Sequence, residues 1–384
     1  MKRFIVPSLC LCFVLACSNP PKEKVEFDIT TIHQETPAEE SILNLSEKYN
    51  LLEIIKLESS DTSLVDYVNK VLLDRNRDVI FIKGGNTVFK FDMSGNFLSK
   101  LSKGTGGPEE FVNLTDLVLL PEQERIWIYD SNKSRIFQFT YDLNLEISYT
   151  IGYQLLGIER FKEGIIGTPG YIEILDNFSL YYLSGENFAT GYKLTSKKLE
   201  FNPEKSRYLH VLRHDFFSQS PEGFNFVNSF NDTIYNINEN FHVIPKFYID
   251  FGDMKILEED LVGKGYSSIV EVFQHINSTE KSFNIGNIVE MKDNLLFRFF
   301  NQGRPFVSVY DKSKKELKSG RKISFEYLNQ QVTFDLDEEI TFGSVGNNSV
   351  YIIIPAESSV LGEYQTLFQV KDGDNPIILL FDEK

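Results

Sequence analysis

Residues 71–101, VLLDRNRDVIFIKGGNTVFKFDMSGNFLSKL, are followed by a second copy of the same pattern in residues 118–149, VLLPEQERIWIYDSNKSRIFQFTYDLNLEISY. Leu72 aligns with Leu119, and the later strands align after one inserted residue, so the period is 47 to 48 residues. Each copy contains four short apolar runs separated by turn residues, which is the pattern of four strands. A four-stranded unit that repeats every 40 to 50 residues or so is typical of a β-propeller blade.

Weaker copies of this unit continue along the chain. They are alternating apolar runs at residues 171–175, 179–183, 233–237, 306–310 and 350–354. Without one insertion, residues 51–384 give six units of about 50 residues each, close to the usual repeat length. We therefore expect an all-β fold: a six-bladed β-propeller of four-stranded antiparallel blades. Residues 51–57 should close the ring by pairing with residues 376–381, because an unpaired edge would otherwise be exposed.

One segment does not follow the strand pattern. In residues 253–282, DMKILEEDLVGKGYSSIVEVFQHINSTEKS, apolar side chains recur at helical spacing around Ile256 and Leu261, and again around Ile269 and Phe273. We expect a short helical insertion between two blades.

The first residues have the order of a secretory signal. Residues 1–3 are basic, and the apolar run that follows is shorter than the roughly 20 residues needed to span a bilayer. The run ends in four residues that resemble the bacterial lipobox, namely Val14, Leu15, Ala16 and Cys17. We expect residues 1–16 to be a lipoprotein signal peptide and residues 17–50 to be the lipidated Cys17 with a polar, flexible tether. An ordinary signal peptide that contains cysteine by coincidence is the alternative.

Cysteine content and net charge exclude several classes of function. Cys10, Cys12 and Cys17 all lie at or before the expected cleavage site, so no other thiol remains for disulfides, metal binding or catalysis. The formal net charge of -16 opposes binding to nucleic acid, and no basic cluster offsets it. We expect an outer-membrane lipoprotein of the bacterial cell envelope, held to the membrane by its lipid, with either the periplasmic or the surface face as its location.

Two motifs carry a resemblance to a known repeat. In IWIYDSNKSRIFQF, Asp130 precedes Arg135, as in an NHL blade, and we expect the two side chains to form a hydrogen-bonded pair across the hairpin. The stretch GTGGPEEF resembles the G-x-G-P-G-E-F link between NHL-like blades, with Glu109 where that family usually has glycine. Glycines in such a link allow positive φ and close backbone approach. The residues of this link with an expected structural role are Gly104, Gly106, Gly107, Pro108 and Phe111.

Together with residues 232–235, 247–252 and 374–377, these motifs make the chain similar to the Bacteroidota 6-bladed β-propeller lipoprotein family. The resemblance implies a fold and an envelope location, and it implies no established activity. We expect a monomeric propeller.

Few residues are candidates for a metal-binding site. His210 and His214 are four residues apart and would share one face of a helix or strand, but the glutamate of the H-E-x-x-H motif is absent. Asp250 and Asp253 lie on either side of Gly252 and could hold calcium, which prefers oxygen ligands. Turn formation explains aspartate beside glycine without an ion. We therefore predict no metal site and no cofactor, with calcium as the weaker alternative.

Two functions remain open. No G-x-S-x-G elbow, P-loop or dinucleotide fingerprint is present in the sequence, which favours a non-catalytic binding or scaffolding protein. Its partner would be a peptide, a glycan or another protein, contacted by loops at the mouth of the propeller channel. The alternative is a metal-assisted hydrolase, lactonase or lyase that uses the channel, an idea that rests on the fold alone.

Overall fold

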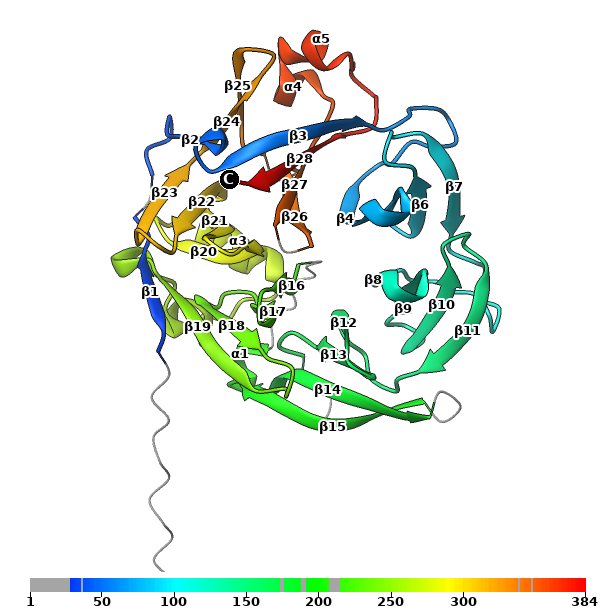
Figure 1. The fold of residues 1–384 in the computed structure, drawn as a ribbon. Helices are drawn as coiled ribbons and strands as arrows, with labels where there is room; N and C mark the ends of the chain where they lie inside the picture. The colour runs from blue at the N-terminus through cyan, green and yellow to red at the C-terminus, as the bar shows by residue number, and fades with distance from the viewer. Residues whose placement is uncertain are drawn as a thin grey trace, which may run out of the picture.

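The computed structural model describes residues 28–35, 37–172, 176–187, 191–206, 215–337, 339–346 and 348–384. Within these residues the strands form seven sheets, which are arranged in a ring (Figure 1). Five sheets contain four consecutive antiparallel strands, a sixth joins three C-terminal strands to one N-terminal strand, and the seventh has three strands. The chain is therefore an all-β propeller with few helices.

The two quoted repeats form one blade each, as predicted. The first blade consists of β4 (Val68–Asp74), β5 (Val79–Gly84), β6 (Thr87–Phe91) and β7 (Phe97–Ser102). The second consists of β8 (Asp116–Leu120), β9 (Arg125–Asp130), β10 (Arg135–Thr140) and β11 (Leu145–Thr150). In both, a short 3-10 turn joins the first two strands: η2 (Arg75–Arg77) and η3 (Pro121–Gln123).

Four further blades have four strands of the propeller each. The next is β12 (Gly157–Phe161), β13 (Gly164–Thr168), β14 (Phe178–Asn187) and β15 (Gly191–Glu200). It is followed by β16 (Phe217–Ser220), β17 (Gly223–Phe226), β18 (Thr233–Ile237) and β19 (Val243–Asp250). Then come β20 (Ser282–Glu290), β21 (Asn294–Asn301), β22 (Arg304–Asp311) and β23 (Glu316–Gly320). The last blade is β26 (Thr341–Val345), β27 (Ser349–Ile354), β28 (Ile377–Glu383) and β3 (Tyr49–Lys56).

Alternation along the strands explains the packing between blades. In β5, Ile80 and Ile82 pack against the last blade, whereas Val79 and Phe81 pack against the second blade. All four side chains are at most 3% exposed. A strand that is covered on both faces needs apolar residues at every position, which is why this run reads VIFI rather than alternating with polar residues.

The ring is closed by pairing between the two ends of the chain. β28 pairs antiparallel with β3, with Ile378 opposite Ile55. This confirms the predicted pairing of residues 51–57 with residues 376–381, and it leaves the last blade without an open edge on that side.

The seventh sheet contradicts the predicted blade count. It consists of β2 (Ile42–Asn44), β24 (Lys322–Tyr327) and β25 (Gln330–Asp335). With this sheet the described residues form seven blades, so the prediction of six blades was wrong. Dividing the length into equal units of about 50 residues overlooks a unit whose hairpin takes only residues 322–335.

The segment assigned to a tether also differs from the prediction. β1 (Thr30–His33) pairs in parallel with β19, and β2 pairs in parallel with β24. Ile32 and Leu43 are 2% and 3% exposed. Residues 28–35 and 37–48, which we call the N-terminal strap, therefore lie on the propeller and are not a free tether. The two strands are too short for their apolar pattern to be recognised in the sequence.

Short helices lie between and beside the blades. In the predicted insertion, η4 (Gly252–Met254), α2 (Glu258–Leu261) and α3 (Ile269–Asn277) connect β19 to β20. Ser268 caps α3, and the buried Val272 and Ile276 of α3 belong to the same apolar cluster as Phe283 of β20. The others are η1 (Leu45–Glu47), α1 (Pro203–Ser206), α4 (Ser358–Leu361) and α5 (Tyr364–Phe368). None of the described helices has the length and apolar character needed to cross a membrane.

Candidate functional site

A cavity of about 450 Å³ lies among the innermost strands. This volume falls in the range of small-molecule sites, roughly 300–1,000 Å³. The polar and charged residues of its wall come from different blades: Asn69, Lys70, Asp74, Arg75, Asn76, Glu159, Asp215, Ser218, Gln219, Asn287, Thr341 and Ser344. We call this space the axial cavity.

A buried ion pair supports one side of the axial cavity. Lys70 Nζ of β4 donates to Asp116 Oδ1 of β8 over 2.9 Å, and the two side chains are 15% and 4% exposed. Asp116 also accepts hydrogen bonds from the backbone N–H groups of Leu117 and Ile158. Burial by itself would lower the pKa of Lys70, but the neighbouring Asp116 carboxylate raises it overall. Lys70 therefore stays charged, and Asp116 joins the inner strands of three blades.

Glu159 of β12 lies beside this pair on the wall of the cavity. Burial raises its pKa to about 7, against the opposing effects of the Lys70 charge and a hydrogen bond from the Arg160 N–H. That N–H, 2.9 Å from Oε1, donates the hydrogen bond that Glu159 accepts among the described residues. Glu159 is thus a weakly satisfied carboxyl group that titrates near neutral pH.

On the opposite part of the wall, the inner strand β20 is irregular. Its register with β21 shifts twice, between Phe283 and Gly286 and again between Gly286 and Val289. Asn287 lies in this stretch with a φ of +46°, and its backbone N–H donates to the Asp215 carboxylate. A left-handed backbone of this kind is tolerated by asparagine better than by most residues.

Polar atoms on this part of the wall lack protein partners. The Asn287 side chain is 8% exposed, and its Nδ2 donates to the Phe342 carbonyl over 3.0 Å. Within the described part of the chain, Asn287 Oδ1 and Ser218 Oγ are buried with no hydrogen-bond partner. Buried polar groups are nearly always satisfied by protein, water or ligand, so these atoms mark positions where a bound molecule would be stabilised.

The sequence contains a signal for part of this wall that belongs to none of the motifs described above. Asn69 and Asp116 are 47 residues apart, at equivalent positions of the two repeats, where each inner strand begins. Asn69 Oδ1 accepts from Lys83 Nζ over 3.3 Å, and burial lowers the pKa of Lys83 to about 8. A polar residue that recurs with the repeat period, in an otherwise apolar strand, indicates an axial position.

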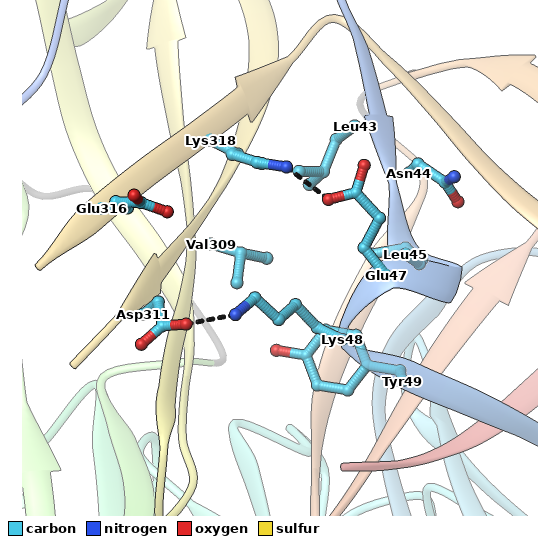
Figure 2. Close-up of a pocket in the computed structure, with 10 residues that line it drawn as sticks. All are labelled: Leu43, Asn44, Leu45, Glu47, Lys48, Tyr49, Val309, Asp311, Glu316 and Lys318. Atoms are coloured by element: carbon cyan, nitrogen blue, oxygen red, sulfur yellow. Dashed lines mark hydrogen bonds and ion pairs between the residues drawn. The ribbon is translucent and has the colours of Figure 1, made fainter. Parts of the chain in front are cut away.

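A second cavity, beside the N-terminal strap, is too small for a ligand. Figure 2 shows Lys48 and Lys318 pointing into it, each toward a carboxylate. Lys48 pairs with Asp311, and Lys318 pairs with Glu47. The hydrogen bond from Lys48 is the main reason that the pKa of Asp311 is lowered. The remaining volume of about 20 Å³ has room for one water molecule. We interpret these contacts as fastening the strap to β22 and β23.

The predicted link of residues 104–111 forms a closed structural unit. One carboxylate oxygen of Glu110 accepts from the backbone N–H groups of Thr105, Gly106 and Gly107, at 2.9, 3.1 and 3.0 Å. Gly106 has a φ of +119°, and a Cβ at Gly104 would lie 2.5 Å from Glu110. The glycines are therefore required where the chain wraps around its own carboxylate.

The remaining residues of the link are held by their neighbours. Phe111 is 2% exposed and packs edge-on against Phe137 and Phe139. Lys133 donates to the carbonyl groups of Gly107 and Glu110, at 2.7 and 2.6 Å. The link thus bridges the first blade to the second.

Asp130 and Arg135 occupy the predicted positions but have other partners. They face each other in the register of β9 and β10. Asp130 Oδ2 accepts from the N–H groups of Val112 and Asn113, at 2.7 and 3.1 Å. Arg135 donates to the Pro108 carbonyl and to Ser148 Oγ. The predicted pair between them was therefore wrong, because the nearby backbone of the link offers the carboxylate several donors.

The weak metal candidates are not brought together. Asp250 accepts from His33 Nδ1 at 2.9 Å and from the Gly252 N–H at 3.0 Å, as in a turn that is fixed by its own side chain. Asp253 is exposed at the start of the insertion. Across the described ranges no group of three or more His, Cys, Asp or Glu side chains is arranged to hold a metal ion. His210, His214, Cys17 and the lipobox residues lie outside the described residues.

The ring of sheets around a central cavity defines a β-propeller protein. The chain belongs to the family described as "Domain of unknown function (DUF4934)", whose model matches residues 29–382. This match includes most of the N-terminal strap. None of the curated proteins compared with the chain matches it.

Two solved structures share the fold. One is a protein of Bacteroides fragilis described as exported, with a TM-score of 0.70 and 14% identity, over 93% of this chain and 99% of that one. The other is a member of the DUF4221 family from Bacteroides vulgatus, with a TM-score of 0.53 and 12% identity, over 88% and 98% of the two chains. At these identities the likeness extends to the propeller fold alone.

Proposed function

We propose that this chain is a non-catalytic binding propeller of the bacterial cell envelope, anchored by a lipid on Cys17, that holds a small polar ligand in its axial cavity. The axial cavity is the observation that carries this proposal. It has the volume of a small-molecule site, and its wall combines fixed charges with polar atoms that have no protein partner. A sugar or a short peptide is the kind of molecule that fits this description.

The wall is better suited to binding than to catalysis. Lys70 and Asp116 neutralise each other in a pair that joins three blades, so neither is free to act as an acid, base or nucleophile. Glu159 is the remaining weakly satisfied carboxyl group near them. The described carboxylates of the wall do not converge as metal ligands. A metal-assisted hydrolase therefore has no observation in its favour, and we do not propose it.

The envelope location is supported by the N-terminal sequence. Residues 1–17 have the order of a lipoprotein signal, and a protein of the same fold from Bacteroides fragilis is described as exported. The test is metabolic labelling with an alkyne fatty acid. The native chain should take up the label, and Cys17→Ala should not. A native chain that stays unlabelled would refute the anchor and leave the cavity proposal unaffected.

Ligand binding is tested by blocking the axial cavity. A panel of sugars, amino acids, peptides, amines and nucleosides is screened by thermal shift, and each hit is measured by calorimetry. Ser344→Phe places an aromatic ring on the wall and should abolish binding of the hits. Leu98→Phe, at a side chain 49% exposed on the outer strand β7, is the matched control and should bind normally. Hits that bind Ser344→Phe as well as the native protein would refute an axial site.

A further inference from the structure

The charged groups of the axial cavity balance one another. The described residues of its wall include two cations and three acids, and the groups directly beside them add two cations and one acid. The cations are Lys70, Arg75, Arg77 and Lys83, and the acids are Asp74, Asp116, Glu159 and Asp215. Lys70 pairs with Asp116 at 2.9 Å, and Arg77 pairs with Asp74 at 3.2 Å. The wall therefore offers no excess of either sign to a charged ligand.

Uncharged side chains make up most of the wall. Its amide and hydroxyl groups belong to Asn69, Asn76, Ser218, Gln219, Asn287, Thr341 and Ser344. The aromatic rings of Phe217, Phe342 and Tyr351 line the same space. Amide and hydroxyl side chains can each donate and accept hydrogen bonds. A sugar has the matching chemistry, because its hydroxyl groups also donate and accept, and its C–H faces can lie against aromatic rings.

Asn287 provides an acceptor whose direction is fixed. Its Nδ2 donates to the Phe342 carbonyl over 3.0 Å, and a carbonyl group can only accept, so the amide cannot be reversed without losing this bond. Oδ1 is therefore the end that remains, and it is buried with no hydrogen-bond partner among the described residues. The side chain as a whole is 8% exposed. A buried acceptor of this kind favours a ligand that donates a hydrogen bond to it.

The backbone around Asn287 differs from a regular strand. Its φ is +46°, and it lies where the register of β20 with β21 shifts. Irregular strands and left-handed residues of this kind are frequent beside binding sites, because they direct a side chain that a regular strand would place elsewhere. Ser218 of β16, in the preceding blade, adds a buried hydroxyl group without a partner to the same wall.

We propose that the ligand of the axial cavity is a neutral sugar, and that Asn287 selects it by accepting a hydrogen bond from one of its hydroxyl groups, with Ser218 as a second partner. This inference rests on the proposed binding function and specifies its ligand class. A short peptide also supplies donors through its N–H groups, and the experiment separates it from a sugar.

The experiment measures binding to the purified chain by calorimetry at pH 7. The neutral probes are glucose, galactose, mannose, maltose, lactose and cellobiose, and the charged probes are glucosamine, glucuronate and glycylglycine. At least one neutral sugar should bind, and it should bind at least about tenfold more tightly than every charged probe.

Asn287→Gly tests the selecting residue. Glycine adopts a left-handed backbone readily and keeps the N–H that donates to Asp215, so this variant removes the side chain with little backbone strain. It should weaken binding of the sugar at least about tenfold, because the hydroxyl group loses its acceptor. Asn284→Gly is the matched control, since Asn284 lies in the same strand with a φ of +59° and is not part of the wall. It should bind the sugar as the native chain does.

Monodeoxy analogues of the sugar that binds distinguish selection from a structural role. One analogue should bind the native chain at least about tenfold more weakly than the parent sugar, yet bind Asn287→Gly as well as the parent sugar does, because this variant has no acceptor to lose. A residue with only a structural role would weaken the parent sugar and all analogues by the same factor. Ser218→Ala should weaken sugar binding by a smaller factor than Asn287→Gly.

The outcomes separate the two proposals. The sugar inference is overturned if no neutral sugar binds, if a charged probe binds as tightly, or if Asn287→Gly weakens the parent sugar and every analogue equally. Unchanged binding to Ser218→Ala would remove Ser218 from the site. In each case the binding function is still judged by the separate panel: other hits that Ser344→Phe blocks keep the axial site, and hits that it does not block remove the function itself.

Discussion

The link of residues 104–111 with its neighbours and the wall of the axial cavity are both built from charged side chains and backbone amides, but they differ in what remains unsatisfied. Glu110 in the link accepts hydrogen bonds from three backbone N–H groups, and Asp130 of β9 accepts from those of Val112 and Asn113, directly after the link. On the wall, Glu159 accepts a single one from the described residues, and Asn287 Oδ1 accepts none. The repeated motif thus marks a structural joint, whereas the open polar groups lie where no motif was recognised.

The largest expected effect comes from the one buried pair of the wall that is fully satisfied. Lys70→Met leaves the Asp116 carboxylate buried without its cation, which should lower the free energy of unfolding by about 3–5 kcal/mol. Urea denaturation measures this difference. The double variant Lys70→Met with Asp116→Asn should recover part of the loss. If the single variant were as stable as the native chain, the pair would not support the wall.

A comparable loss is expected in the link. Asp130→Ala removes a fully buried carboxylate and leaves the N–H groups of Val112 and Asn113 without an acceptor, which should cost about 2–4 kcal/mol. Ligand affinity of the remaining folded protein should be unchanged. Asp142→Ala, at a side chain 81% exposed, is the control, with an expected change below about 0.5 kcal/mol. A loss of binding without a loss of stability would contradict the structural role of Asp130.

The smallest expected effect has the opposite sign and depends on pH. The pKa of Glu159 is raised from 4.5 to about 7 by burial, so the folded state favours the protonated form, and stability is lost as the pH rises through this range. Glu159→Gln mimics the protonated form and avoids that loss. At pH 8 it should therefore be more stable than the native chain by about 1–3 kcal/mol.

At pH 5 the two proteins should unfold at nearly the same urea concentration. Glu163→Gln should follow the native chain at both pH values, because this side chain is exposed to solvent. A difference between Glu159→Gln and the native chain that is equally large at pH 5 and pH 8 would show that ionisation of Glu159 is not its cause.

The strongly apolar strands and the ring closure could be predicted from the sequence. β5 and β9 are covered on both faces and therefore consist of uninterrupted apolar runs that repeat with the blade period. β1 and β2 could not be recognised, because they have four and three residues and are stabilised by pairing with strands more than 200 residues away in the chain. The sheet of β24 and β25 was missed for another reason, since its hairpin takes only residues 322–335 and is shorter than the repeat unit.

The candidate site was less predictable than the fold, for a related reason. Lys70, Asp116 and Glu159 belong to three different blades, so no short spacing in the sequence connects them. The register of Asp130 and Arg135 followed from the repeat, but their partners did not, because the competing donors belong to the preceding link. Local pattern determines where a side chain lies in its blade, and the arrangement of the blades determines what it contacts.

The N-terminal strap has a mechanical consequence. Because β1 pairs with the outer strand of one blade and β2 with another sheet before the chain reaches β3, a pull on residue 28 first loads the β1–β19 pair. The β3–β28 pair that closes the ring bears the load only after β1 and β2 have both separated. In a protein held at its N-terminus, the β1–β19 and β2–β24 pairs would thus separate before the β3–β28 pair that closes the ring.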